Sequence, residues 1–201
     1  MPEPLHPAEV RVLGALLEKE ITTPEYYPLT VNALVNACNQ KSNRDPVVNY
    51  TDEVVQQALA LLRHKGLAVR ISGAGHRVEK YGHLLGEKLN LGRRESALLC
   101  MLMLRGPQTV GELRGRTERM YEFTELADVE HCLESLASRE PEPLVAPMPR
   151  GRWTHLLSGT PDPVVEEPYT PPTDLEHRVT TLEREVADLK QMLESFRRQF
   201  E

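Results

Sequence analysis

Apolar residues recur at helical spacing in six stretches of the chain, which fall into two groups of three. Proline, threonine or aspartate precedes several of these stretches, and glycine follows others, as is typical of helix caps. The expected helices begin at or next to Pro7, Thr30, Asp52, Arg93, Gln108 and Leu126. The pattern therefore predicts two consecutive segments of three helices each.

Each group of helices is followed by two short stretches of strand character. Leu67–Ile71 and Arg77–Tyr81 flank a glycine-rich turn in the first segment. Leu144–Ala146 and Trp153–His155 form the second pair, with prolines that shorten its strands. Three helices followed by a two-stranded hairpin are the element order of a winged helix, so each segment is predicted to be one.

An internal repeat of about 75 residues, too long for a solenoid unit, supports this division. The sequence YGHLLG at 81–86 returns as WTHLLSG at 153–159. In each copy an aromatic residue stands two positions before a histidine, so Tyr81 and His83, like Trp153 and His155, should share one strand face and pack against the first helix. We expect a mainly α fold with small β-wings (α+β), with tandem winged-helix domains over residues 1–86 and 87–159.

The end of the chain has a different pattern. Residues 160–174 are rich in proline and acidic residues and predict an extended linker. Residues 175–201 are heptadic, as in a coiled coil. The predicted seam consists of Leu175, Val179, Leu182, Val186, Leu189, Leu193 and Phe196. We expect this C-terminal amphipathic helix to form a homodimer; the alternative is that it docks on its own domain or on a partner.

The net charge of −6 is concentrated in this tail. Residues 1–86 carry nine basic and nine acidic side chains, residues 87–160 carry ten and eleven, and residues 161–201 carry five and ten. Two nearly neutral domains create no global field that attracts DNA. Any affinity for DNA must therefore come from a local basic patch.

Several classes of protein are disfavoured. The chain lacks an apolar run long enough to span a membrane, and its N-terminus lacks the features of an export signal, so a cytoplasmic protein is expected. The cysteines are far apart and form no CxxC, which argues against disulfides and against a zinc site. No GxSxG and no phosphate-binding glycine loop is present. We expect no enzymatic activity, no metal and no cofactor.

Three runs of the sequence carry a resemblance to a known family. TTPEYYPLT at 22–30, CNQKSNRDP at 38–46 and LRGPQTVGELRGRTERM at 104–120 resemble the YceH-like family of uncharacterised bacterial proteins. The matched segment spans residues 5–159, and the terminal helix lies outside it. The resemblance implies a tandem winged-helix fold in the bacterial cytosol, and it implies no mechanism.

The usual ligand of a winged helix is double-stranded DNA, with the third helix in the major groove. In the first segment this helix offers Gln56 and Gln57, whose amides can read base edges. The third helix of the second segment is acidic and should repel phosphates. Its acidic residues are Glu125, Asp128, Glu130 and Glu134.

Basic side chains in the loop after the second helix, along both wings and on the second helix of the second segment are candidates for phosphate contacts. These candidates are Lys41, Arg44, Arg70, Arg77, Lys80, Arg114, Arg116, Arg119, Arg150 and Arg152. The alternative is structural: Arg44 would bridge backbone carbonyls, and the arginines from 114 to 119 would pair with neighbouring glutamates.

The function predicted from these residues is that of a non-enzymatic, DNA-binding regulatory protein. Its phosphate contacts would come from the wings and from the arginine cluster. The alternative is an adaptor that binds partner proteins through its winged helices. The neutral domains and the acidic third helix of the second segment favour this alternative, whereas analogy at the level of the fold favours DNA.

Overall fold

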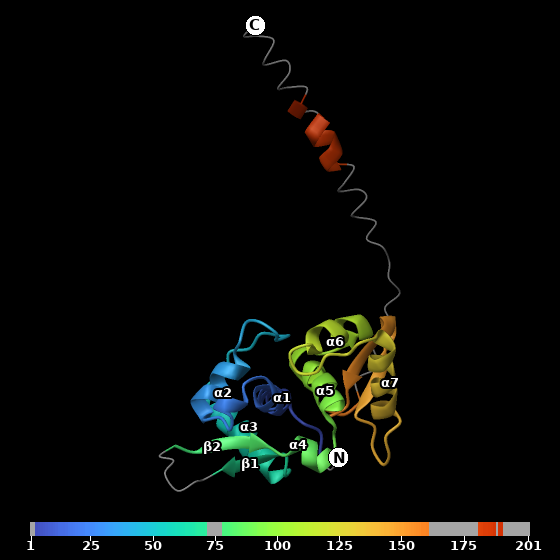
Figure 1. Ribbon diagram of the computed structural model, residues 1–201. Coiled ribbons are helices and arrows are strands. Elements are labelled where there is room, and N and C mark those ends of the chain that lie inside the picture. Colours follow the sequence, from blue (N-terminus) through green and yellow to red (C-terminus); the bar gives the residue numbers. More distant parts are fainter. Residues whose placement is uncertain (1–2, 72–77, 161–180, 188, 191–201) are drawn as a thin grey trace. The chain divides into compact units, whose positions relative to one another are not determined.

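The computed structural model describes residues 3–71, 78–160, 181–187 and 189–190 of the chain. The chain divides into two compact units, Met1–Pro161 and Asp162–Glu201. The first unit is mainly helical and carries small antiparallel strand pairs, as predicted (Figure 1). None of the helices in the described ranges is long and apolar enough to cross a membrane.

The first half of this unit contains three helices and a hairpin. Its elements are α1 (Pro7–Thr22), the 3-10 turn η1 (Pro24–Tyr26), α2 (Val31–Cys38), α3 (Asp52–His64), β1 (Ala68–Ile71) and β2 (Lys80–His83). The Thr30 hydroxyl caps α2 by accepting a hydrogen bond from the Ala33 N–H at 3.3 Å. Gly66 follows α3 with φ +67°, a conformation that favours glycine. The three helices therefore begin and end where the caps predict.

The returning strand of the first hairpin differs from its prediction. It begins at Lys80, three residues later than expected, and Arg77 lies outside the described residues. The register follows from Tyr81, which pairs with Arg70 on one side and exchanges two backbone hydrogen bonds with Leu29 on the other. Leu29 and Tyr81 are both buried, so the contact between these two residues fixes the position of the strand around Tyr81.

The second half repeats the order of elements. After the short α4 (Leu85–Leu89) come α5 (Arg93–Arg105), β3 (Gln108–Thr109), α6 (Val110–Thr117), α7 (Leu126–Ala137), β4 (Val145–Met148), the 3-10 turn η2 (Pro149–Gly151) and β5 (Arg152–His155). The strands form a sheet of order β3-β5-β4, with Pro147 on the edge strand opposite Trp153. This repeated order of elements is consistent with the winged-helix interpretation of both halves.

Two details of the second half differ from expectation. Leu126, an apolar residue at the predicted start of the sixth helix, was expected to line the core with the other apolar residues of that helix. It is instead 47% exposed, because it occupies the first turn of α7, outside the packed stripe. The helix α4 was not predicted, since five residues are too few to show a helical period. The predicted boundary between residues 86 and 87 falls inside this helix and stays a prediction.

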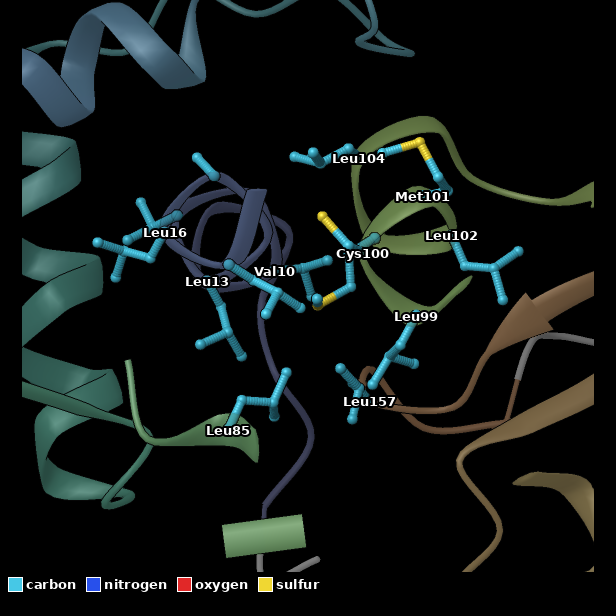
Figure 2. Packing of buried hydrophobic residues seen from close by; sticks show 14 of the residues in the cluster. Val10, Leu13, Leu16, Leu85, Leu99, Cys100, Met101, Leu102, Leu104 and Leu157 are labelled. Atoms are coloured by element: carbon cyan, nitrogen blue, oxygen red, sulfur yellow. The ribbon is translucent and has the colours of Figure 1, made fainter. Parts of the chain in front are cut away.

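The core of the first unit is continuous across both halves. Helices α1 and α5 lie side by side at its centre, with α2 and α3 against α1 and with α6 and α7 against α5 (Figure 1). Side chains of both central helices meet leucines from the segments around them (Figure 2). Gly14 allows the close approach, because a Cβ there would lie 3.0 Å from Leu104 Cδ2. The two halves therefore form one packed unit.

In the second unit, residues 181–187 and 189–190 are helical. Three seam positions of the predicted coil lie in this part, and Leu182, Val186 and Leu189 are all exposed. The remaining seam positions, Leu175, Val179, Leu193 and Phe196, lie outside the described residues, as does most of the predicted linker. The coiled coil and the homodimer stay predictions.

Candidate nucleic-acid interface

The outward face of α3 carries the side chains predicted to read bases. Val55, Ala58, Leu59 and Leu62 are buried, at the spacing of one helical face. This orientation leaves Gln56 and Gln57 exposed, with Arg63 and His64 in the last turn. The two amides therefore stand on the surface, as groove readout requires.

A basic hollow lies beside this face, between the end of α3 and the first strand. It has a volume of about 570 Å³ and is lined by Arg63, His64 and Arg70 together with small apolar residues. Arg70 donates to Glu79 at 2.6 Å (Nη1 to Oε1), across the hairpin. The Tyr81 hydroxyl and the Arg70 guanidinium lower the pKa of Glu79, so this carboxylate stays charged and offsets Arg70. Arg63 also feels the charge of Glu79, but it makes no hydrogen bond or close ion pair among the described residues and is the cation of this hollow most available to a phosphate.

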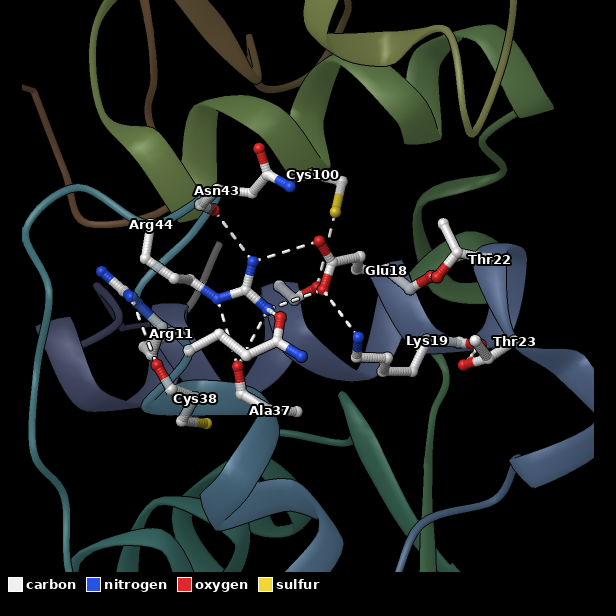
Figure 3. Close-up of polar contacts among 12 residues, drawn as sticks. Arg11, Glu18, Lys19, Thr22, Thr23, Ala37, Cys38, Asn43, Arg44 and Cys100 are labelled. Carbon is white, nitrogen blue, oxygen red and sulfur yellow. Dashed lines mark hydrogen bonds and ion pairs between the residues drawn. The ribbon is translucent and has the colours of Figure 1, made fainter.

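The prediction that Arg44 contacts phosphate is wrong, because its side chain is buried (Figure 3). Its guanidinium donates to both carboxylate oxygens of Glu18, at 2.6 and 3.1 Å. It also donates to the carbonyl of Ala37 in the last turn of α2, from Nε at 3.2 Å and from Nη2 at 2.9 Å. The structural alternative, in which Arg44 bridges backbone carbonyls, is confirmed.

A second buried arginine, not anticipated from the sequence, holds the same loop. Arg11 of α1 donates to the carbonyls of Cys38 at 3.4 Å and Pro46 at 2.6 Å, at the two ends of residues 39–46. Burial, and then the charge of Arg44, lower the pKa of Arg11. The available signal was the pair Arg11 and Glu18, which flank the uninterrupted non-polar run at 12–17.

The arginine group of the second half is partly engaged within the protein. Arg114 donates to the carbonyls of Phe123 (Nε, 3.2 Å) and Thr124 (Nη2, 2.8 Å), just before α7. Arg116 donates to Gln108 Oε1 at 2.8 Å and pairs with Glu112 at 3.0 Å. Arg119 is exposed and has no partner within the described ranges. Only Arg119 is thus fully available to a ligand.

The remaining basic candidates lie on the wings. Arg150 is exposed in the η2 turn, at the tip of the second hairpin. Arg152 is also exposed, but it donates to the Pro107 carbonyl at 2.9 Å. Lys80 is half-buried at the start of β2. The wing cations are therefore spread over two separate hairpins.

The outward face of α7 is acidic. Glu125, Asp128, Glu130 and Glu134 are all exposed, whereas Val129, Cys132, Leu133 and Leu136 are buried. An exposed acidic face repels the phosphates that border a groove. The sequence-based argument against groove binding by this helix therefore rests on side chains that the structure places on the surface.

The structure also brings together cations that the sequence leaves far apart. Lys41 of the loop lines the same cavity as Arg116 and Arg119, and Lys19 of α1 joins them. In Figure 1 the loop at 39–46 and the hairpin β1–β2 lie on opposite sides of α1. This inter-half cavity is therefore separate from the hollow beside α3.

The repeated aromatic and histidine pairs are mainly structural, as expected. Tyr81 is buried, and His83 Nε2 lies 2.8 Å from Glu20 Oε2 of the first helix. His155 is largely buried, its Nδ1 has no partner among the described residues, and burial lowers its pKa to about 4. No group of three or more potential metal ligands occurs within the described ranges.

These features define a mainly helical α+β protein with a glutamine-bearing third helix and separate basic surfaces. Residues 5–152 match the family described as "Protein of unknown function, DUF480", so the chain belongs to that family. The resemblance to an uncharacterised bacterial family is thereby confirmed.

Relatives cover almost the whole chain. A UPF0502 protein of Solibacter usitatus is 54% identical, with 98% of each chain covered. A UPF0502 protein of Opitutus terrae is 51% identical, over 92% of this chain and 83% of the relative. Another, from Geobacter sulfurreducens, is 48% identical over 98% of each chain. The similarity therefore includes the region of the terminal helix.

Proposed function

We propose that this protein is a non-enzymatic, DNA-binding regulatory protein of the bacterial cytoplasm, built from tandem winged helices. The exposed face of α3 carries this proposal, because Gln56 and Gln57 stand beside a hollow lined by Arg63 and Arg70. An amide can read a base edge in the major groove, and a flanking guanidinium can hold the phosphate at its border.

The two halves contribute unequally to this interface. The acidic face of α7 stays out of the groove, so the first half reads DNA alone. We expect the exposed Arg150 of the second wing to contact a neighbouring phosphate or to enter the minor groove, and Arg152 to contribute less because it already donates to the Pro107 carbonyl. The arginines at 114 and 116 contribute less than the sequence predicts, because both already hold partners within the protein.

Fluorescence anisotropy of a labelled random duplex, at low and moderate salt, tests this proposal. We expect binding that falls steeply with salt. The double variant Arg63→Gln/Lys80→Gln should weaken it about tenfold and make the salt dependence shallower. The matched control is Lys41→Gln/Arg119→Gln, which removes the same charge at the inter-half cavity. Absence of binding at low salt, or equal loss in both variants, would reject the proposal.

The acidic, exposed face of α7 favours a second function, that of a protein–protein adaptor. Leu126 at the start of this helix is exposed among the carboxylates, a mixture suited to a basic protein partner. Duplex binding that is absent at low salt, together with a partner whose capture is abolished by Glu130→Lys/Glu134→Lys, would support the adaptor.

We further propose that the terminal helix makes the protein a homodimer. Leu182, Val186 and Leu189 are exposed at heptad spacing, as the seam of a coiled coil requires before it pairs. Removal of residues 161–201 should give a folded monomer in sedimentation velocity, because the first unit has its own core. A truncated chain that still sediments as a dimer would show that the dimer contact lies elsewhere.

A further inference from the structure

The inter-half cavity is a hollow lined by residues from both halves of the first unit. It has a volume of about 460 Å³ and is bounded by α1, the loop at 39–46, α5 and the chain that leaves α6. Sites for small organic ligands in proteins typically enclose about 300–1,000 Å³. The cavity is therefore large enough for a whole small organic molecule.

Cations outnumber anions around this cavity. Lys19, Lys41, Arg116 and Arg119 line it, and Glu18 is the one acidic residue in the lining. Glu18 is already neutralised, because Arg44 holds both of its oxygens from the buried side. Lys41 and Arg119 have no ion-pair partner in the described part of the chain. The cavity consequently presents uncompensated positive charge.

Two side-chain amides add hydrogen-bond donors. Gln40 Oε1 accepts from Arg44 at 3.1 Å, and Asn43 Oδ1 accepts from Arg105 at 3.0 Å. A guanidinium can only donate, so the amide atom that it contacts must be the oxygen. The NH₂ groups of Gln40 and Asn43 are thus left to donate. The lining therefore combines charge with neutral donors, as the several oxygens of a phosphate require.

The loop that carries these donors is held before any ligand arrives. Within the loop, Arg11 donates to the Pro46 carbonyl at 2.6 Å and Arg44 donates to the Asn43 carbonyl at 2.8 Å. The Asp45 N–H donates to the Leu104 carbonyl of α5 at 3.0 Å. A loop fixed in this way loses little conformational entropy when it binds. Both halves of the first unit thereby hold the site in shape.

The cavity also has an apolar side. Met101 of α5 and Met120 after α6 line it and are both almost fully buried. Methionine side chains adapt to the flat or irregular apolar surface of a ligand. Such a lining suits the organic part of a ligand whose anionic group is held by Lys41 and Arg119.

We propose that the inter-half cavity binds a small organic phosphate, an anionic phosphate ester with an apolar or aromatic body. The phosphate is held by Lys41 and Arg119, with Lys19 and Arg116 beside them, and the organic body lies toward Met101 and Met120. The site is separate from the hairpin β1–β2 beside α3, which lies on the other side of α1 (Figure 1).

Isothermal titration calorimetry of the full chain at low ionic strength tests this site, with a thermal-shift assay in parallel. The probes are adenosine monophosphate, glucose 6-phosphate, inorganic phosphate, citrate and adenosine. We expect at least one of the two phosphate esters to bind and raise the Tm. Inorganic phosphate and citrate should bind about tenfold more weakly or not at all, since neither fills the apolar side, and adenosine should not bind.

The double variant Lys41→Gln/Arg119→Gln should weaken the ester at least about tenfold, because two charged hydrogen-bond donors are lost. Both residues are exposed and unpaired, so the fold is retained. The matched variant Arg63→Gln/Lys80→Gln should leave ester binding unchanged.

Several outcomes would overturn the proposal. Absence of binding by both esters rejects the site, and equal binding of inorganic phosphate or citrate rejects the organic phosphate. Equal losses in the two double variants reject the location. Displacement of the bound ester by a short duplex would assign the cavity to DNA instead. The first three of these results do not depend on whether the duplex binds at α3.

Discussion

Helices α3 and α7 occupy the same place in the two halves. Their buried faces are alike, whereas their exposed faces differ. The buried positions Val55, Ala58, Leu59 and Leu62 have the same spacing as Val129, Cys132, Leu133 and Leu136. The exposed positions differ in chemistry: Gln56 and Ala60 of α3 correspond to Glu130 and Glu134 of α7. The exposed Arg63 corresponds to the partly buried Ala137. The same spacing of buried residues thus supports two helices with different exposed surfaces. The repeat therefore conserves the packing of the two halves and does not give them the same binding surface.

The largest expected effects test whether the inner faces are equivalent. Leu59→Ala and Leu133→Ala each remove a fully buried side chain, so each should lower the free energy of unfolding by about 2–5 kcal/mol. Urea denaturation of the full chain measures both. The exposed neighbours Gln57→Ala and His131→Ala serve as controls and should change stability by less than about 0.5 kcal/mol. A large loss of stability from only one of the two leucine variants would show that the buried faces of α3 and α7 are not equivalent.

Exchange of the outer faces should have the next largest effect. Gln56→Glu/Ala60→Glu gives α3 the carboxylates that α7 carries, so duplex affinity should fall roughly a hundredfold through repulsion of phosphates. The reverse change in α7, Glu130→Gln/Glu134→Ala, should alter affinity by less than about threefold. Anisotropy titrations compare the two variants at one salt concentration. A stronger effect from the α7 variant would place DNA on the second half.

The repeated histidines His83 and His155 allow the two halves to be compared through the pH dependence of stability. Burial lowers the pKa of His155 to about 4, whereas Glu20 opposes the lowering of the pKa of His83. A histidine with a lowered pKa binds fewer protons when folded, so stability is complete above the unfolded pKa and falls as the pH falls toward 4. The expected slope is up to about 1.4 kcal/mol per pH unit between about 6.5 and 4.

Urea denaturation at pH 7 and pH 5 measures this slope. His155→Gln should reduce it strongly, and His83→Gln should reduce it less. A wild-type slope that persists in His155→Gln would assign the pH dependence to other groups.

Substitutions at the helix caps should give the smallest changes in the free energy of unfolding. Thr30 and Thr109 cap the second helices of the two halves, and each accepts from a backbone N–H three residues on, at 3.3 Å. Thr109 also donates to Glu112, and the Thr109 N–H bonds the same carboxylate. Either alanine variant should cost about 1 kcal/mol, with Thr109→Ala the more costly. Chemical denaturation compares the variants, and serine at either position should restore most of the loss.

Much of the local structure could be predicted from the sequence because its causes are local. Apolar spacing identified most of the inner faces of α3 and α7, but it also assigned Leu61 and Leu126 inward, and both are exposed. Thr30, Gly66 and Gly106 marked helix boundaries. The periodicity of apolar residues does not show, however, which other helix packs against a given helix face. The packing of α1 on α5 depends on Gly14 and Leu104, which are ninety residues apart in the chain.

The candidate site could be predicted less well, because charge along a sequence does not reveal burial. Arg44 stands in a polar loop, and its partner Glu18 lies 26 residues earlier, so nothing nearby indicates that the pair is inside. Lys41 and Arg119 were predicted separately as phosphate contacts. Only the contact between the halves shows that they line one cavity.

The close approach of α1 and α5 at Gly14 has a consequence for how fragments of the chain should fold. Since α1 and α5 bury their faces in each other, neither half has a complete interior of its own. Fragments 1–86 and 87–161, produced together, should therefore find one another and reassemble without a covalent link, whereas either fragment alone should aggregate. The interface between the two halves therefore resembles the interface between the subunits of an obligate dimer, except that a peptide bond joins the two partners.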